Sequence, residues 1–344
     1  MKEDLMSLQS TSHMNLTTVN QSDVCQEYSC PERSVSFSVY VILYAAAAAV
    51  SLLSVCGNLL VIISVSHFKQ LHTPANILIL SLAVSDLLVG VFVMPFHLSW
   101  LIESCWISGP VMCSVFSFVT FQAPSVSVHT VALIAVDRFL ALSSPFLYSE
   151  KISPTVTCIA TIFNWLFSLI YNLTLLYINN FTGIMCPGEC LYIIDKVSSL
   201  VDLIVIFLMP CTLIIILYSH VFVIAKKHAT AIRALQIHNR TESSKNRVSD
   251  KSELKAALAL GILVFVFLLC LLPFYILSLT NFLKDYSFSK VINSVLVLVY
   301  LNSSINPLLY ALLYPWFKKS VKIILTLRVL NTDSSLMNVL SLNS

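Results

Sequence analysis

Residues 36–66 have the sequence SFSVYVILYAAAAAVSLLSVCGNLLVIISVS, which is thirty-one residues long and contains no Asp, Glu, Lys or Arg. Five consecutive alanines at positions 45–49 favour a helix over a strand. A helix that crosses the hydrocarbon core of a bilayer needs about 20 mainly apolar residues. This stretch therefore predicts a transmembrane helix.

Six further stretches of the same kind follow it along the chain. A membrane-spanning β-barrel would instead show alternating segments of about ten residues. We therefore expect an all-α membrane protein, a seven-transmembrane helix bundle that occupies residues 36–314. The other six spans are predicted at about 73–101, 110–140, 153–178, 197–225, 255–283 and 289–314.

The composition of the 344 residues agrees with this class and excludes others. Hydrophobic residues make up 57% and charged residues only 11%, whereas a soluble domain carries about 25% charged side chains. The net charge of +3 is too small to indicate a nucleic-acid partner. The chain has no GxSxG, HExxH or Walker motif, so we do not expect an enzyme. Internal repeats are absent too, which disfavours a transporter or a scaffold with a receptor fold.

The basic residues predict the orientation of the chain in the plasma membrane. Fifteen of the twenty Lys and Arg lie on the side of the loops at 66–73, 141–152 and 226–254 and of the C-terminus. The positive-inside rule then places the N-terminus outside the cell. Residues 1–35 are expected to be an extracellular glycosylated tail, and the acceptor sequons on the outer side begin at Asn15, Asn20 and Asn180.

Six cysteines fall on the predicted outer side, where disulfides persist. Six cysteines allow fifteen pairings, so the spacing alone fixes none of them. They are Cys25, Cys30, Cys105, Cys113, Cys186 and Cys190.

Charged side chains within the spans are rare and point to function. Asp86 lies in the second span and Asp202 in the fifth, while the Asp137-Arg138 pair closes the third. A charge at the centre of a membrane helix costs about 2.5–3.5 kcal/mol on insertion scales. The plain alternative for each is a satisfied polar contact between helices.

These and other marks, one or more in each span, resemble those of rhodopsin-type G-protein-coupled receptors over the whole chain. Residues 66–74 (SHFKQLHTP) and 302–317 (NSSINPLLYALLYPWF) narrow the resemblance to trace amine-associated receptors. The marks are Gly57-Asn58, Leu82–Asp86, Asp137-Arg138-Phe139, Trp165, Pro210, Tyr218, Phe267, Pro273 and Asn306-Pro307 with Tyr310.

The resemblance implies two disulfides. By likeness to the subfamily, Cys113 pairs with Cys190. An N-terminal cysteine, Cys30 in preference to Cys25, pairs with Cys186.

The resemblance also implies a ligand site with one departure from the common pattern. In aminergic relatives an aspartate stands eighteen residues before the arginine of the third span, on the same helix face, and here that position is Thr120. Some fish members similarly lack this aspartate and keep an acid in the fifth span. Asp202 is therefore expected to pair with a ligand ammonium. The matching pocket aromatics are Phe274, Tyr275 and Tyr300, which are otherwise ordinary core residues.

A second polar group matches the positions that line the family's central sodium site. A bound Na⁺ acting as an allosteric ion is the one cofactor expected, and a water-filled network without sodium is the alternative. The residues are Asp86, Ser127, Asn302, Ser303 and Asn306.

The resemblance implies signalling through a Gs or olfactory-type G protein to raise cyclic AMP in olfaction. Arg138, which with Asp137 belongs to the activation switch, would be held at rest by Glu253 and released on activation. Tyr218, Tyr310 and Phe267 match further switch positions, whereas Leu271 stands where relatives usually have Trp. Thr120 and Leu271 leave open a non-amine ligand or a weakly active receptor.

After the last span, residues 315–329 carry apolar and lysine faces on opposite sides. We expect an amphipathic helix on the inner leaflet. Residues 330–344 follow as a cytoplasmic tail.

Overall fold

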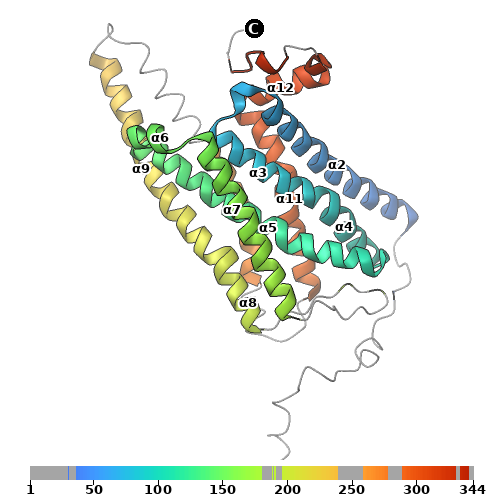
Figure 1. Ribbon diagram of the computed structural model, residues 1–344. Helices are drawn as coiled ribbons and strands as arrows, with labels where there is room; N and C mark the ends of the chain where they lie inside the picture. The colour runs from blue at the N-terminus through green and yellow to red at the C-terminus, as the bar shows by residue number, and fades with distance from the viewer. Residues whose placement is uncertain are drawn as a thin grey trace, which may run out of the picture.

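A computed structural model of the chain describes residues 30, 36–179, 188, 190, 196–238, 259–277, 289–330 and 334–340. Within these residues the molecule is a bundle of helices (Figure 1), and seven of them are long and apolar enough to cross a membrane. The predicted seven-helix bundle is confirmed. The spans are Phe37–His67 (α2), Pro74–Glu103, Gly109–Ser143 (α5), Pro154–Ile178 (α7), Val197–Ile224, Ala259–Leu277 and Ser294–Leu313.

The second and fifth spans are each interrupted by one π-helical turn, η2 or η3. Each turn ends two residues before a proline, Pro95 or Pro210. Proline lacks an N–H and its ring clashes with the carbonyl four residues earlier, and a π turn locally widens the helix. The segments in chain order are α3 (Pro74–Leu88), η2 (Val89–Val93), α4 (Met94–Glu103), α8 (Lys196–Asp202), η3 (Leu203–Leu208) and α9 (Met209–His238).

Two spans begin with the same local device, a hydroxyl cap followed by proline. The Thr73 side chain accepts a hydrogen bond from the backbone N–H of Asn76 at 3.4 Å, and Ser153 accepts one from Val156 at 3.2 Å. Proline follows each cap at the first helical position, where no N–H is required. The sequence therefore sets where α3 and α7 start.

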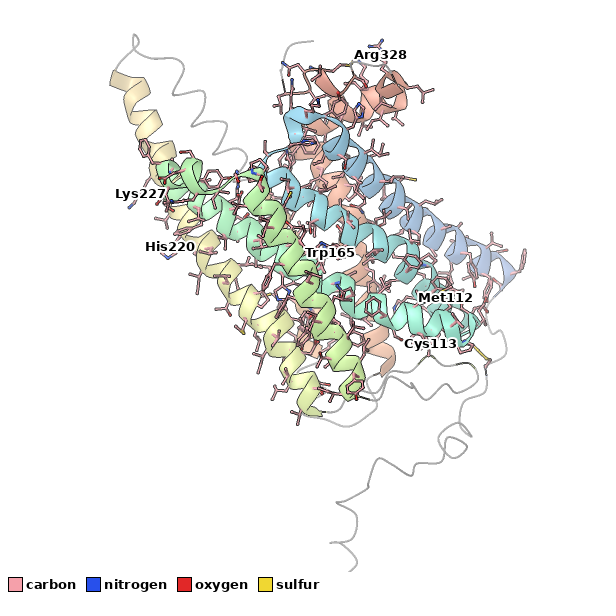
Figure 2. The ribbon with its side chains drawn as sticks, in the orientation of Figure 1. Met112, Cys113, Trp165, His220, Lys227 and Arg328 are labelled. Atoms are coloured by element: carbon pink, nitrogen blue, oxygen red, sulfur yellow. A yellow bond between two sulfur atoms is a disulfide. The ribbon has the colours of Figure 1, made fainter. Side chains whose placement is uncertain are left out.

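The α7 helix turns its polar face inward and its apolar face outward. Asn164, Ser168 and Asn172, spaced four residues apart, are buried, whereas Phe163 and Ile170 are 70% and 65% exposed. Lipid is as apolar as these outer side chains, so membrane helices associate through packing and interhelical hydrogen bonds. One such bond runs from Trp165 Nε1 to Ser81 Oγ on α3, at 3.0 Å (Figure 2).

The two ends of the bundle differ. Cys113 marks the disulfide end and Arg328 lies at the α12 end (Figure 2). At the α12 end, Trp316 and Phe317 are buried and Lys318 and Lys322 are exposed, as an amphipathic helix requires. The seventh span is part of α11 (Ser289–Leu313). The shorter elements are η1 (Lys69–Leu71), α6 (Pro145–Lys151), α12 (Pro315–Leu325), η4 (Arg328–Leu330) and η5 (Ser334–Leu336).

Residues 334–340, here called the C-terminal strap, fold back beside α12 onto the short loop after α2 (Figure 1). Ser334 Oγ shares a hydrogen bond with His67 Nε2 at 2.9 Å, and the Val339 N–H donates to Gln70 Oε1 at 3.3 Å. Val339 is only 1% exposed and belongs to the hydrophobic core.

The disulfides of the structure agree with one of the two expected cysteine pairings and differ from the other. Cys113 bonds Cys190, as the resemblance implied. Cys30, however, bonds Cys105, so the pairing of Cys30 with Cys186 is wrong. The Trp106 N–H donates to the Gly188 carbonyl at 2.5 Å, and a Cβ at Gly188 would stand about 3 Å from both sulfurs of the Cys30–Cys105 bond. The turn after α4 thus brings Cys105, which the resemblance had left without a partner, against residue 30.

Candidate functional site

Asp202 is the last residue of α8 and lies where the π turn η3 begins. Its side chain is half-buried. The Tyr171 hydroxyl on α7 donates a hydrogen bond to Oδ1 of this carboxylate at 3.3 Å. Among the residues that the structure describes, Tyr171 is the one hydrogen-bond partner of the Asp202 side chain.

Aromatic rings flank this acid on the side of the helix Ala259–Leu277. Tyr275 stacks on Phe207 of η3 with ring centroids 3.9 Å apart, and Phe274 meets Tyr275 edge-on at 5.1 Å. Tyr275 also lies close enough to Asp202 for the two side chains to interact electrostatically. Three spans therefore contribute side chains to the surroundings of one carboxylate.

The other two predicted pocket residues form a separate group on α5 and α11. Thr120 Oγ1 and the Tyr300 hydroxyl are both buried and lie close to each other, and neither has a further hydrogen-bond partner among the described residues. The Tyr300 ring is 2% exposed and meets the His97 ring edge-on at 5.0 Å. His97 in turn stacks on Phe116 at 6.2 Å. A neutral, hydroxyl-bearing aromatic site thus occupies the place of the missing third-span acid.

The sequence prediction missed Tyr171, His97 and Phe116. A signal for Tyr171 existed, because Asn164, Ser168 and Asn172 mark the inward face of α7 and Tyr171 adjoins it. His97 and Phe116 carry no comparable pattern, since buried aromatic residues are ordinary in any core.

Asp86 lies at the centre of a buried polar group. Its Oδ1 accepts a hydrogen bond from Ser303 Oγ at 2.8 Å, and its Oδ2 accepts one from Asn306 Nδ2 at 2.7 Å. Ser127 Oγ shares a hydrogen bond with Ser85 Oγ at 2.8 Å. Asp86, Ser303 and Asn306 are therefore joined by hydrogen bonds, and Ser127 is bonded to Ser85, the residue before Asp86. These four predicted sodium-site residues come from the second, third and seventh spans.

A small cavity of about 20 Å³ adjoins these residues. Oδ1 of Asn302 and Oδ1 of Asn306 are buried and have no hydrogen-bond partner in the described part of the chain. A space of this size holds one water molecule, and hard oxygen ligands suit a small cation. The donor set therefore fits Na⁺ or water. The walls include Asp86, Ser127, Phe267, Leu271, Asn302 and Ser303.

Arg138 lies near the α12 end of α5 and is paired with its neighbour. Asp137 Oδ2 accepts hydrogen bonds from Arg138 Nε at 2.9 Å and Nη2 at 2.5 Å, and both side chains are buried. Oδ1 of Asp137 accepts a bond from the Tyr148 hydroxyl on α6 at 2.8 Å. Asp137 therefore links the arginine to α6.

Comparison with known proteins gives a consistent result. The family model for 7 transmembrane receptors of the rhodopsin family matches residues 57–310. Trace amine-associated receptor 7c of Rattus norvegicus is 37% identical over 339 residues, which cover 94% of this chain and 94% of that receptor. Trace amine-associated receptor 8b of Mus musculus is 38% identical over 330 residues, or 91% and 94%. The chain belongs to the trace amine-associated receptors, within the rhodopsin family.

As a member of this family the chain is a multi-pass receptor of the plasma membrane that acts through a small-molecule ligand and a G protein, and is not an enzyme.

The other predicted switch residues are buried. The hydroxyls of Tyr218 and Tyr310 are buried without a hydrogen-bond partner among the described residues, and Phe267 is 1% exposed. Leu271, in place of the usual tryptophan, forms part of the wall of the Asp86 cavity.

Several predicted residues lie outside the part of the chain that the structure describes. They are Glu253, Cys25, Cys186, Asn15, Asn20 and Asn180.

Proposed function

We propose that this receptor senses amines and pairs the ligand ammonium with Asp202. The observation that carries this proposal is the setting of the acid, which is half-buried between α7 and η3 with a single hydrogen-bond partner among the described residues. Asp86 is instead engaged by Ser303 and Asn306, and Asp137 by Arg138. Asp202 is thus the intramembrane acid left with acceptor capacity for a ligand.

Aromatic residues around the acid would add to the attraction. An ammonium over the face of a tyrosine or phenylalanine gains about 0.5–2 kcal/mol, and Phe274, Tyr275 and Phe207 lie on this side. A charge-assisted hydrogen bond to the carboxylate contributes about 1.5–3 kcal/mol. An amine bound in this way would lie shifted toward the fifth span, because Thr120 offers no charge in the third.

The bound amine would then signal through Arg138. In this proposal ligand binding breaks the contacts that hold Arg138, including Asp137 and Glu253, and opens the α12 end to a Gs or olfactory-type G protein. Cyclic AMP rises as a result, in an olfactory cell. The N-terminus lies outside the cell, with glycans on Asn15, Asn20 and Asn180.

This proposal can be tested by applying a panel of amines to cells that express the receptor and report cyclic AMP. We expect Asp202→Asn, which keeps the size of the side chain, to lower the response to the best amine by at least about tenfold. Glu103→Gln is the matched control, because it removes an acid near the same end that is bonded to Tyr44 at 2.6 Å. Equal surface expression is verified by an N-terminal epitope tag. No response to any amine, or an unchanged response in Asp202→Asn, would overturn the proposal.

We also propose that Na⁺ binds at Asp86 with Ser127, Asn302, Ser303 and Asn306, and that it favours the resting state. Agonist affinity of the wild type should fall when NaCl replaces N-methylglucamine chloride at constant ionic strength, since the ion and the active state compete. Asp86→Asn should abolish this sodium effect. Equal sodium dependence in both proteins would show that the group binds water alone.

A second candidate function is recognition of a neutral ligand. The observation in its favour is the pair of buried, neighbouring hydroxyls on Thr120 and Tyr300, which have spare capacity to bind an uncharged polar group. A neutral agonist would act with the same potency below and above the pKa of an aliphatic amine, whereas an ammonium ligand would lose potency at high pH.

A further inference from the structure

Only one of the two oxygens of Asp202 is held by a described residue. The Tyr171 hydroxyl donates to Oδ1, and Oδ2 has no hydrogen-bond partner in the described part of the chain. An ionised carboxylate is purely an acceptor, and it needs both oxygens to receive a guanidinium in the parallel two-bond arrangement. The Tyr171 hydroxyl therefore already takes up one of the two acceptor positions of Oδ1, and a guanidinium would have to share that oxygen with it.

Tyr171 does not depend on Asp202 for its position. Its ring stacks on Phe167 one helical turn earlier, with centroids 6.3 Å apart. The next residue, Asn172, is 1% exposed and donates hydrogen bonds to Gln122 Oε1 at 3.0 Å and to the Ser168 carbonyl at 2.8 Å. This part of α7 is thus fixed against α5, and the hydroxyl is held beside the acid.

A pair of aromatic rings also lies near the acid. Phe207 belongs to the π turn that begins directly after Asp202, and it stacks on Tyr275 at 3.9 Å. Stacked rings cannot donate a hydrogen bond to the carboxylate from their faces, so they leave its acceptor capacity unchanged.

We propose that Tyr171 determines ligand specificity by occupying one of the two acceptor positions of Asp202 Oδ1, so that the site prefers the ammonium of a primary amine to a guanidinium. This inference rests on the proposed pairing of ligand and Asp202. An ammonium is a compact donor that is satisfied by Oδ2 alone, whereas a guanidinium gains its advantage from two parallel bonds, one to each oxygen. A guanidine ligand would have to share Oδ1 with the Tyr171 hydroxyl, displace that hydroxyl, or bind with one arm.

The test compares the best primary amine of the panel with the guanidine made from it, on the same carbon skeleton. In the wild type we expect the amine to be more potent by about tenfold or more, the value of one charge-assisted hydrogen bond. Tyr171→Phe removes only the hydroxyl and should shift this potency ratio toward the guanidine by about tenfold. Tyr177→Phe is the matched control, because Tyr177 lies on the same helix and is 83% exposed.

The ratio of the two potencies is the informative measurement, since a general loss of folding or expression would lower both alike. If Tyr171→Phe does not reach the cell surface, Tyr171→Leu provides the same comparison. A wild type that responds equally to both ligands, or an unchanged ratio in the variant, would falsify the role of Tyr171. Failure of the pairing itself is distinguishable, because Asp202→Asn would then leave the amine response intact.

Discussion

Some polar side chains inside the bundle are hydrogen-bonded to neighbouring helices. Asn172 illustrates this, because its amide joins α7 to Gln122 on α5 and is almost completely buried. Such a bond contributes only about 1 kcal/mol net, but a buried group left without its partner costs about 1–3 kcal/mol. In membranes the measured values are at the low end of this range.

Replacing Asn172 by leucine should therefore destabilise the receptor modestly. The change leaves Gln122 Oε1 without its donor, and we expect the melting temperature of the solubilised receptor to fall by about 2–4 °C. Thr174→Val is the control, because the exposed Thr174 hydroxyl bonds only the carbonyl of Ile170 in its own helix. Equal losses in the two variants would contradict the interhelical role of Asn172.

At this scale the sequence was informative where a residue type is rare. Asp86 and Asp202 stand out because charge is expensive within a span, and both lie in polar surroundings in the structure. Tyr171 could not be singled out in the same way, because a tyrosine in a membrane helix is ordinary. The polar residues of α7 indicate that Tyr171 adjoins the inward face of this helix, but they do not indicate its contact with Asp202 on α8.

At the scale of elements, hydrophobic runs predicted six of the seven spans to within a few residues, because lipid dictates their length. The helix Ala259–Leu277 is described over a shorter range than the predicted 255–283. The π turns η2 and η3 were not predicted. Proline signals a disturbed helix but does not say whether the helix bends, breaks or widens. This matters for the site, since η3 begins directly after Asp202.

The C-terminal strap is another element that hydropathy does not predict, because its docking rests on two buried side chains, Ser334 and Val339, and two hydrogen bonds. Val339→Asp would place a charge at a position that is 1% exposed and should release the strap. Cleavage by chymotrypsin after Leu336 should then accelerate by about tenfold, because proteolysis follows the open population. Leu340→Asp, at a neighbouring position that is 55% exposed, should leave the cleavage rate unchanged. Equal cleavage rates in the Val339→Asp and Leu340→Asp variants would show that the C-terminal strap is not docked through Val339.

For the whole molecule, the disulfides connect parts of the chain that lie far apart in sequence. Cys30 and Cys105 are separated by 75 residues, and Cys113 and Cys190 by 77. The number of cysteines left fifteen pairings open, and the resemblance implied the wrong partner for Cys30. The actual partner follows from how the turn after α4 meets Gly188, which depends on the completed bundle.

The Cys30–Cys105 pairing can be tested by combining substitutions, because two changes that break the same bond do not add. Loss of a disulfide that closes a loop of this length costs about 2–5 kcal/mol. Cys30→Ser, Cys105→Ser and the double variant should therefore have equal melting temperatures, all below that of the wild type. In the Cys186→Ser variant the Cys30–Cys105 bond should persist, so adding Cys30→Ser to that variant should cost as much stability as Cys30→Ser costs in the wild type. The opposite pattern, additive for Cys105 and non-additive for Cys186, would restore the pairing that the resemblance implied. In that case Cys30 would not be bonded to Cys105 in the turn after α4, and Gly188 would not pack against a Cys30–Cys105 bond.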